Sequence, residues 1–321
     1  MYQRTKAEKR HSEKICDEIH GNAPAYSAVT ASWRRSMLHH GLTPNKQYSA
    51  SQLSASELRD AKQGLGLLMH VAKPIMEQLF QSVGRSGCCV ILSDMNGVII
   101  HRLINTVDDL SFDEWGLRSG AVWSEEKQGT NGIGTCVIEE RPVLIHKDQH
   151  FRYKNIGMTC MGAPIFDIQG KIMAVLDVSS ARNDLDRDFA QVIASFVADI
   201  ASKIEAEYFR ASFSNAQIVV ADGYSPNGTP LLASDRDDLV IGANRAARRM
   251  LSLQDETFST PIPRSDLLAT PEEVTGLLAA ERAELRRAIA RTKGNMSATA
   301  KDLGVSRATL YRLLKKHGLG G

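Results

Sequence analysis

The sequence has few of the features that mark secreted or membrane proteins. Five cysteines in 321 residues are a small and odd number, which does not suit a disulfide framework, so we expect reduced thiols. No apolar run approaches the roughly 18–20 residues of a membrane-spanning helix, and the first ten residues are polar, unlike a signal peptide. We therefore expect a cytoplasmic protein with no membrane partner.

The motifs of several enzyme classes are also missing. The chain has no Gly-x-x-x-x-Gly-Lys-Ser/Thr phosphate loop, no Gly-x-Ser-x-Gly elbow and no His-Glu-x-x-His motif. The glycine-rich segment 129–135 lacks the preceding strand and the acidic residue of a dinucleotide site. Four cysteines share a region with His146 and His150, but their spacing matches no zinc pattern. We predict no catalytic residues, no metal and no cofactor.

Basic residues are concentrated at the C-terminal end. Residues 281–321 contain ten Lys or Arg and three Asp or Glu, a net charge of about +7. Because the whole chain carries only +2, the preceding residues sum to about −5. A weakly acidic body with a basic end is expected when one module contacts phosphates. A merely solvated basic surface would give the same count, so the pattern of apolar residues has to decide.

Three short helical patterns fill this basic end. Gly294 stops the first and Asn295 caps the second, which places small Ala300 one turn before Gly304, where two helices must cross closely. Ser306 caps the third. Apolar residues at helical spacing define the core faces of the first and third helices: Leu285, Ala288, Ile289, Leu310, Leu313 and Leu314. The pattern predicts a helix-turn-helix whose last helix enters the major groove of DNA.

Residues 281–318 resemble the DNA-binding domain of the Fis family. The matching residues are Gly294-Asn295, Ala300, Leu303-Gly304, Arg307, Thr309-Leu310, Lys315-Lys316 and Gly318. Tyr311 and Leu313 stand where the founding member carries basic residues, so its DNA preference is not transferred. The resemblance implies groove-facing side chains at Ser306, Arg307, Thr309 and Arg312. It implies phosphate contacts from Lys293, Asn295, Ser297, Thr299, Lys315 and Lys316.

The region before the helix-turn-helix is predicted to be α+β. Residues 1–60 are mostly helical, with an amphipathic helix from Ala28 that ends at Gly41 and Pro44, and a second helix runs from Ser56 to about Gln81 with a kink or break at Pro74. Two β-hairpins follow at 87–104 and 159–179, with a short strand at 141–146 between them. A helix from about 186 to 209 closes the unit, which suits one antiparallel sheet with helices packed on it.

This layout and its motifs resemble a GAF domain of the type that precedes Fis modules in AcoR-like regulators of acetoin and related catabolism. The matching residues are Gly129-Thr-Asn-Gly-Ile-Gly-Thr135, Arg141-Pro142, His150-Phe151, Thr159-Cys160, Ala163-Pro164-Ile165, Asp167, Gly170 and Val175-Leu-Asp-Val-Ser179. Near the N-terminus, Ser32-Trp33-Arg34 and Gly41-Leu42-x-Pro44 match as well.

The predicted fold class is α+β, with a GAF-like antiparallel sheet flanked by helices, a partial PAS-like segment and an all-α C-terminal Fis-type helix-turn-helix. The predicted domains are 1–60 (helical), 61–211 (GAF-like sensor), 212–253 (partial PAS-like), 254–270 (linker) and 271–321 (helix-turn-helix). The run from Ile241 to Ala247 carries the PAS resemblance, and a small α/β spacer is the alternative. Pro261 and Pro263 favour the linker, while Thr270, Pro271 and Glu273 suit a helix start.

The glycine-rich segment 129–135 is the candidate roof of an effector pocket, because its glycines allow tight turns and close packing. Two tryptophans flank it, although buried aromatics are usually core residues. Some GAF domains hold metal or haem, but free buried cysteines commonly behave as small hydrophobes. The candidate effector-binding residues are Trp115, Trp123, Thr130, Asn131, Ile133, Thr135 and Cys160.

AcoR-like regulators usually carry a central ATPase that remodels a specialised RNA polymerase. This chain has neither its phosphate loop nor enough residues between the GAF-like region and residue 280 to contain it. Activation by recruiting RNA polymerase, or repression by occlusion, must replace that mechanism, and the sequence does not choose between them.

The sequence therefore predicts a non-enzymatic, ligand-responsive DNA-binding transcriptional regulator. Its partners would be a small-molecule effector, a palindromic double-stranded operator and a second copy of the chain, with half-sites about one helical turn apart. The helices near 60–81 and 186–209 are the candidate dimer seam. One alternative is a non-catalytic architectural or partner-binding DNA protein that uses the GAF-like unit for dimerisation. Another is a GAF-based reductase, which leaves the basic helix-turn-helix unexplained.

Overall fold

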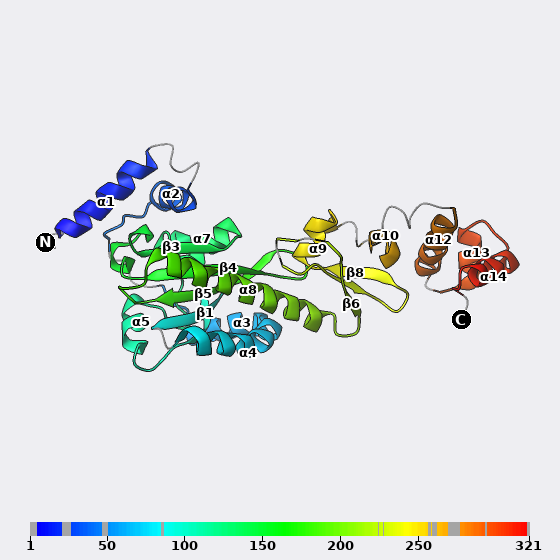
Figure 1. The fold of residues 1–321 in the computed structure, drawn as a ribbon, viewed down its shortest axis with the longest axis horizontal. Coiled ribbons are helices and arrows are strands. Elements are labelled where there is room, and N and C mark those ends of the chain that lie inside the picture. The colour runs from blue at the N-terminus through cyan, green and yellow to red at the C-terminus, as the bar shows by residue number, and fades with distance from the viewer. Residues whose placement is uncertain are drawn as a thin grey trace. The chain divides into compact units, whose positions relative to one another are not determined.

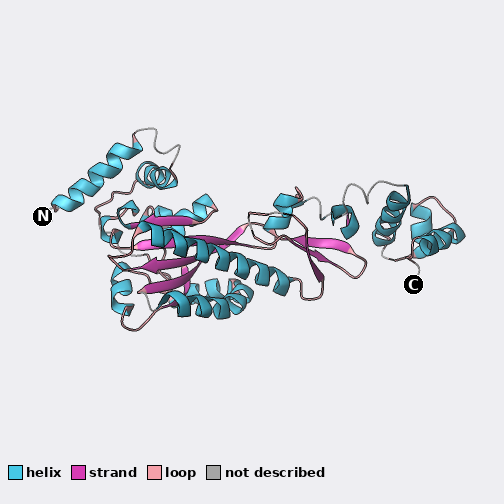
Figure 2. Ribbon diagram, in the orientation of Figure 1, coloured by secondary structure: helices cyan, strands magenta, loops and turns pink. Residues whose placement is uncertain are grey.

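The computed structural model describes residues 5–20, 27–46, 51–84, 87–223, 225–226, 228–255, 258, 262–268, 277–292 and 294–319. The chain divides into two compact units. Unit 1 consists of Met1–Asp167 with Lys171–Tyr208, and unit 2 of Ile168–Gly170 with Phe209–Gly321. Helices and strands alternate through the middle of the chain, while its C-terminal end is helical (Figures 1 and 2). The α+β prediction is confirmed.

A five-stranded antiparallel sheet forms the centre of unit 1, in the order β2-β1-β5-β4-β3. Its strands are β1 (Cys88–Asp94), β2 (Ile99–Leu103), β3 (Val143–His146), β4 (Thr159–Phe166) and β5 (Ile172–Ser180). Both predicted hairpins are present, because β1 pairs with β2 and β4 with β5. Gly97 closes the first turn at φ +75°, a left-handed conformation that glycine adopts without strain. The central position of β5 buries side chains on both of its faces.

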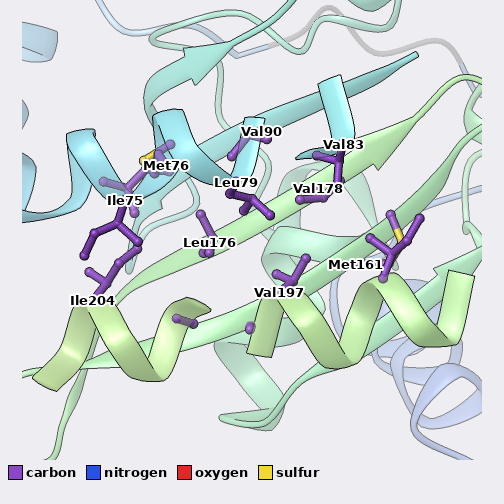
Figure 3. Packing of buried hydrophobic residues seen from close by; sticks show 14 of the residues in the cluster. Ile75, Met76, Leu79, Val83, Val90, Met161, Leu176, Val178, Val197 and Ile204 are labelled. Carbon is purple, nitrogen blue, oxygen red and sulfur yellow. The ribbon is translucent and has the colours of Figure 1, made fainter. Parts of the chain in front are cut away.

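Two long helices cover one face of this sheet: α4 (Gly66–Val83) and α8 (Arg187–Ser212). Alternate strand residues such as Val90, Leu176 and Val178 point toward the helices, as the two-residue period of a strand requires. They pack against Leu79 and Val197, as Figure 3 shows, in one continuous apolar cluster. Burying this cluster supplies the main stabilising free energy of the unit.

The opposite face of the sheet packs against α5 (Asp109–Trp115) and α7 (Gly132–Glu139), with α6 (Glu125–Gln128) just before α7. Cys89 and Ile91 of β1 and Cys160 of β4 contribute to this second core. They alternate with the residues that face α4 and α8. Cys160, one of the predicted effector residues, therefore lies on the face that the short helices cover.

The N-terminal part contains α1 (Lys6–Ile19), α2 (Ala28–Arg34), a π-helical turn (Arg35–His39) and α3 (Ala55–Gly64). The single helix predicted from Ser56 to Gln81 is wrong. The chain breaks at Leu65, between α3 and α4, and Pro74 lies inside α4. Gly64 and Gly66 flank the break, and each glycine costs a helix about 1 kcal/mol relative to alanine.

Unit 2 begins with a four-stranded sheet in the order β6-β7-β8-β9. Its elements are β6 (Gln217–Val220), β7 (Leu231–Ser234), β8 (Leu239–Ala243), α9 (Arg245–Met250), β9 (Ile262–Pro263) and α10 (Arg264–Leu268). The strand, turn, strand and helix expected from 230 to 251 are present. Residues 262–268 do not form the expected open linker, because β9 pairs with β8. Pro261, Thr270, Pro271 and Glu273 lie outside the described residues.

Three helices end the chain: α12 (Leu277–Arg291), α13 (Met296–Asp302) and α14 (Arg307–Lys316). Asn295 and Ser306 cap α13 and α14 as predicted. The expected close helix crossing at Gly304 is wrong, since a Cβ there would meet nothing within 4 Å. Gly304 is instead required by its φ of +66°. The core of the three helices is formed by Leu285, Ala288, Ala300, Leu310 and Leu314.

Candidate DNA-binding surface and sensor site

The last helix presents its basic residues on the side away from its core. Leu310 and Leu314 are buried, whereas Arg307, Arg312 and Lys315 are exposed. Residues three and four apart in a helix share a face, so Arg312 and Lys315 lie together opposite the core. Tyr311, which is 50% exposed, flanks them. An exposed, basic helix face of this kind is suited to the major groove of DNA, which admits an α-helix.

Ion pairs divide the basic side chains into two groups. The Lys316 ammonium lies 2.7 Å from the Glu281 carboxylate, and the Arg291 guanidinium lies 2.6 Å from that of Asp302. Arg307, Arg312 and Lys315 form no ion pair with the residues that the structure describes. These three cations are therefore available to DNA without first breaking a contact.

The remaining residues predicted to contact DNA differ in whether their side chains are exposed. Thr299 is fully buried, and its hydroxyl lies 2.6 Å from that of Thr292, so the prediction of a phosphate contact there is wrong. Asn295 uses its side-chain oxygen to cap α13, with Ser297 exposed beside it. Ser306 and Thr309 share a hydrogen bond of 2.9 Å at the start of α14. Lys293 lies outside the described residues.

In unit 1, the glycine-rich segment forms the junction of α6 and the start of α7. The Asn131 side-chain oxygen accepts hydrogen bonds from the amides of Ile133 and Gly134 at 2.9 and 2.8 Å, so Asn131 is the N-cap of α7. A Cβ at Gly134 would collide with the backbone of Glu125 and Trp123. The expected role of these glycines in close packing is confirmed.

Two predicted effector contacts face the N-terminal helices instead. The Ser32 hydroxyl of α2 lies 2.7 Å from the Thr130 hydroxyl and 3.2 Å from that of Thr135. Ser32 also donates a hydrogen bond of 2.5 Å to the carboxylate of Glu125. All four side chains are buried. Thr130 and Thr135 are thus occupied by an internal network, which corrects their assignment as effector contacts.

Two ion pairs of Arg35 extend the same network. The Arg35 guanidinium binds the Glu125 carboxylate at 2.7 Å and the Glu139 carboxylate at 2.9 Å. The Glu125 side chain is only 1% exposed, and that of Arg35 is 28% exposed. The Trp33 indole donates to the backbone carbonyl of Gln149 at 2.8 Å. Ser32 and Arg35 therefore join the N-terminal helices to α6 and α7, and Trp33 joins them to the turn at Lys147–Gln149.

Four of the seven predicted effector residues come together in the second core: Trp115, Trp123, Ile133 and Cys160. Trp123 is 2% exposed, and its indole donates to the Gly116 carbonyl at 3.0 Å. Trp115 is half-buried, and its ring meets that of Phe112 edge-on, with centroids 5.7 Å apart. Aromatic rings thus line one side of this core, and their contact with an effector stays a prediction.

A chain of buried polar side chains crosses the same face and was missed by the sequence prediction. The His150 Nε2 atom lies 3.2 Å from the Cys160 sulfur, and Ser179 Oγ lies 3.2 Å from that sulfur. Ser179 also donates a hydrogen bond of 2.6 Å to the Asp177 carboxylate. The alternation in 175–179 was the one signal that could have placed Asp177 and Ser179 on the same face.

Burial shifts the pKa values of the titratable side chains in this polar cluster. It lowers the pKa of His150 to about 4 and raises the pKa of Asp177 to about 6. Burial also raises the pKa values of the Cys88, Cys89, Cys136 and Cys160 thiols. Since the thiolate is the nucleophile, none of these four cysteines is activated. The described residues contain no group of three or more metal-binding side chains.

The two shifted groups predict opposite pH effects on the free energy of unfolding. The unfolded chain protonates His150 near its usual pKa of 6.5, so this group lowers stability as pH falls from 6.5 to about 4. Asp177 binds its proton more tightly in the folded state, so its stabilising contribution is lost as pH rises from 3.8 to about 6. We expect acid to destabilise His150→Gln less than the wild type, and Asp177→Asn more. Urea unfolding between pH 4 and 7 measures both, and parallel profiles would contradict the assignment.

A cavity of about 470 Å³ lies in unit 2. Its lining includes Phe213, Asp235, Arg236 and Ile241, and none of the predicted effector residues. The Asp235 carboxylate accepts hydrogen bonds from the backbone amides of Asp237 and Leu239, as a turn-forming aspartate does. The cavity is therefore separate from the aromatic core of unit 1.

Comparison with known protein families assigns both modules. The GAF domain model matches residues 68–201, and the model for bacterial regulatory proteins of the Fis family matches residues 278–317. The chain combines a GAF domain with a Fis-type helix-turn-helix. The GAF match contains the five-stranded sheet together with the second core, and the Fis match contains all three C-terminal helices. Among the described helices, none is long and apolar enough to cross a bilayer.

Curated relatives of this GAF–Fis chain include regulators of transcription. The acetoin catabolism regulatory protein of Cupriavidus necator is 30% identical over 227 residues, which cover 70% of this chain and 34% of the relative. The propane 2-monooxygenase operon activator MimR of Mycolicibacterium smegmatis is 26% identical over 72% of this chain and 38% of its own. The chain thus spans little more than a third of the length of these relatives.

A solved structure supports the fold. A chain of the E. coli DhaR(N)–DhaL complex matches 76% of this chain and 83% of its own length, with a TM-score of 0.52 and 14% identity. At this identity the match shows similarity of fold alone. The GAF–Fis assignment therefore depends on the two family models and the curated relatives.

Proposed function

We propose that this protein is a cytoplasmic, ligand-responsive transcriptional regulator. Its GAF domain senses a small metabolite, and its Fis-type domain binds a palindromic operator as a dimer. The observation that carries the proposal is the exposed face of α14, where Arg307, Arg312 and Lys315 are free of ion pairs with described residues. Cations in this state gain phosphate or base contacts at little cost.

An apolar stripe on α8 supports the dimer. Phe189, Val192 and Phe196 are 57%, 63% and 41% exposed, although all three are large apolar residues. Their spacing of three and four residues places them on one face of the helix. Exposed apolar faces of this kind mark sites of association, and a two-fold axis would pair the stripe with itself. A monomer at micromolar concentration in sedimentation equilibrium would contradict this part of the proposal.

Regulation would not use ATP-driven remodelling of RNA polymerase. Residues 202–277 lie between the two family matches, and they include the four-stranded sheet of unit 2. That segment carries no phosphate loop. Recruitment of RNA polymerase, or occlusion of its promoter, is the mechanism that fits this chain. The PAS resemblance of 212–253 remains a hypothesis about the same segment.

Genome-wide DNA occupancy tests the proposal directly. We expect sharp peaks for the tagged wild-type chain and their loss in an Arg307→Ala/Arg312→Ala variant, because both side chains belong to the free cationic face. The genes beside the peaks would indicate the effector's pathway. Diffuse occupancy that is the same in the wild type and the variant would contradict sequence-specific regulation.

The architectural alternative is favoured by one observation, the tight filling of the second core by Phe112, Trp123 and Ile133, each at most 2% exposed. In that case the GAF domain would serve only to dimerise. Thermal denaturation with a metabolite panel distinguishes the two functions. A sensor domain is stabilised by its ligand, whereas a domain that only dimerises is stabilised by none of the metabolites. A ligand at a hundred times its dissociation constant adds about 2.7 kcal/mol to the free energy of unfolding.

A further inference from the structure

Asp177 is a fully buried carboxylate with one oxygen unused. It lies on β5, opposite Ile91 of β1 and Gly162 of β4, in the middle of the face that α5 and α7 cover. Ser179 donates to Oδ2, while Oδ1 has no hydrogen-bond partner among the described residues. The buried hydroxyl of Ser93, two residues beyond Ile91 on the same face, is also without a partner there. Buried polar atoms in folded proteins are normally paired, so two orphans on one face need an explanation.

Among the described residues, no cationic side chain faces this carboxylate. The ionisable groups around it are thiols, Cys89 on β1, Cys136 on α7 and Cys160 on β4. His150, beyond Cys160, is neutral because burial lowers its pKa to about 4. A buried carboxylate without a counter-charge destabilises the fold unless another group compensates it.

A structural role in capping α7 is excluded by the geometry. The amides of Ile133 and Gly134 are already bound by Asn131. A Cβ on Gly132 would collide with Asp177 Oδ1, so the helix start lies directly on this oxygen without covering it with a donor side chain. Among the described residues, Asp177 thus stabilises neither the helix nor an ion pair. Its second oxygen is therefore available to a group from outside these residues.

The surroundings suit a small, partly apolar molecule. Ile91, Cys160 and Ile133 belong to the aromatic core that contains Phe112 and Trp123. The start of α7 lies directly over Asp177, and α5, in which Phe112 is the one buried residue, covers the adjoining part of this face. Two ion pairs from Arg102, to Asp109 at 2.7 Å and Asp113 at 2.9 Å, hold α5 to β2. Because Asp177 is fully buried, a ligand reaches Oδ1 only when a covering helix moves away from the sheet.

We infer that Asp177 is the polar anchor of the effector site, and that it takes a small ligand whose hydroxyl or ammonium group donates a hydrogen bond to Oδ1. The apolar remainder of the ligand lies against Ile133 and Trp123. This inference rests on the proposed sensing function and specifies its ligand class. A ketone or ether of the same shape offers no donor, so it leaves the carboxylate unpaired and binds more weakly.

Three molecules of nearly equal shape test the ligand class: butan-2-ol, butan-2-amine and butan-2-one. Each is titrated into the full chain by calorimetry and by thermal denaturation at pH 7.5. We expect the alcohol or the amine to bind roughly tenfold more tightly than the ketone, the effect of one hydrogen bond to a charged group. The stronger of the two identifies the donor as hydroxyl or ammonium. If the ketone binds equally well, the anchor is wrong.

The same titrations are repeated with the variant Asp177→Asn. Asp184→Asn is the control, because Asp184 is exposed on the surface. We expect Asp177→Asn to lose the preference over the ketone and Asp184→Asn to keep it. Retention of the preference by Asp177→Asn overturns the anchor and leaves sensing by the GAF domain intact. If neither these three molecules nor a wider metabolite panel stabilises the wild type, both the role of Asp177 as anchor and the sensing function are wrong. The proposal of operator binding is unaffected by that result. The wild-type comparison needs no variant to fold.

Discussion

Replacing Arg312 by alanine is expected to weaken operator binding by about 1–3 kcal/mol, the range for one specific base contact. Arg312 lies opposite the buried Leu310 and Leu314, and no described carboxylate binds it. Its side chain is therefore directed toward the groove when α14 docks. Fluorescence anisotropy with a duplex taken from an occupancy peak measures the loss, and circular dichroism checks that the fold is unchanged.

Lys316→Ala is the matched control for this prediction. Lys316 lies on the same helix and carries the same charge, but its ammonium is held by Glu281 at 2.7 Å. It should therefore lose much less affinity than Arg312→Ala. Lys315→Ala should weaken all duplexes alike and reduce the slope of log affinity against log salt by about 1, as expected for a phosphate contact. Equal losses at Arg312 and Lys316 would show that overall charge, and not the free face of α14, determines binding.

Replacing Arg35 by methionine is expected to give the largest loss of stability in unit 1, about 3 kcal/mol or more. The substitution leaves the Glu125 carboxylate, 1% exposed, without its cation. Among the described residues, Ser32 is then the one remaining donor to it, and the linked hydroxyls of Thr130 and Thr135 lose their fixed arrangement. Urea denaturation of the full chain, followed by tryptophan fluorescence, measures the effect because Trp33 and Trp123 are buried in unit 1.

Two further variants separate charge burial from general damage. Arg35→Met/Glu125→Gln removes the buried charge together with its partner, so it should recover part of the loss. Arg182→Met breaks the pair with Asp184, whose side chains are 48% and 69% exposed, and should cost less than about 1 kcal/mol. A loss at Arg35 no larger than at Arg182 would mean that the N-terminal helices contribute little to the fold of the GAF domain.

Local signals in the sequence determined much of the architecture. Asn295 and Ser306 cap their helices through amides two or three residues away, so their roles follow from short-range geometry. The turn at Gly97 depends on one left-handed residue, and it placed the first hairpin correctly. The same local reasoning failed at Gly304, because a glycine can satisfy either a close crossing or a left-handed turn.

The contacts of the candidate sensor residues could not be predicted from local sequence. Thr130 and Thr135 stand in the predicted segment, but their partner Ser32 comes from a helix 98 and 103 residues earlier. Asp177 and Ser179 lie near Cys160 because β4 and β5 are neighbours in the sheet. Lys316 differs from Lys315 because α12 places Glu281 beside it.

By itself, the sequence determined that an α+β module is followed by a helix-turn-helix, because caps, turns and apolar periodicity act over a few residues. Only the tertiary structure decided which cations are free, which hydroxyls are occupied and which carboxylate is buried without a partner. Those properties depend on side chains brought together from distant segments, and burial then sets the cost of every unpaired polar group.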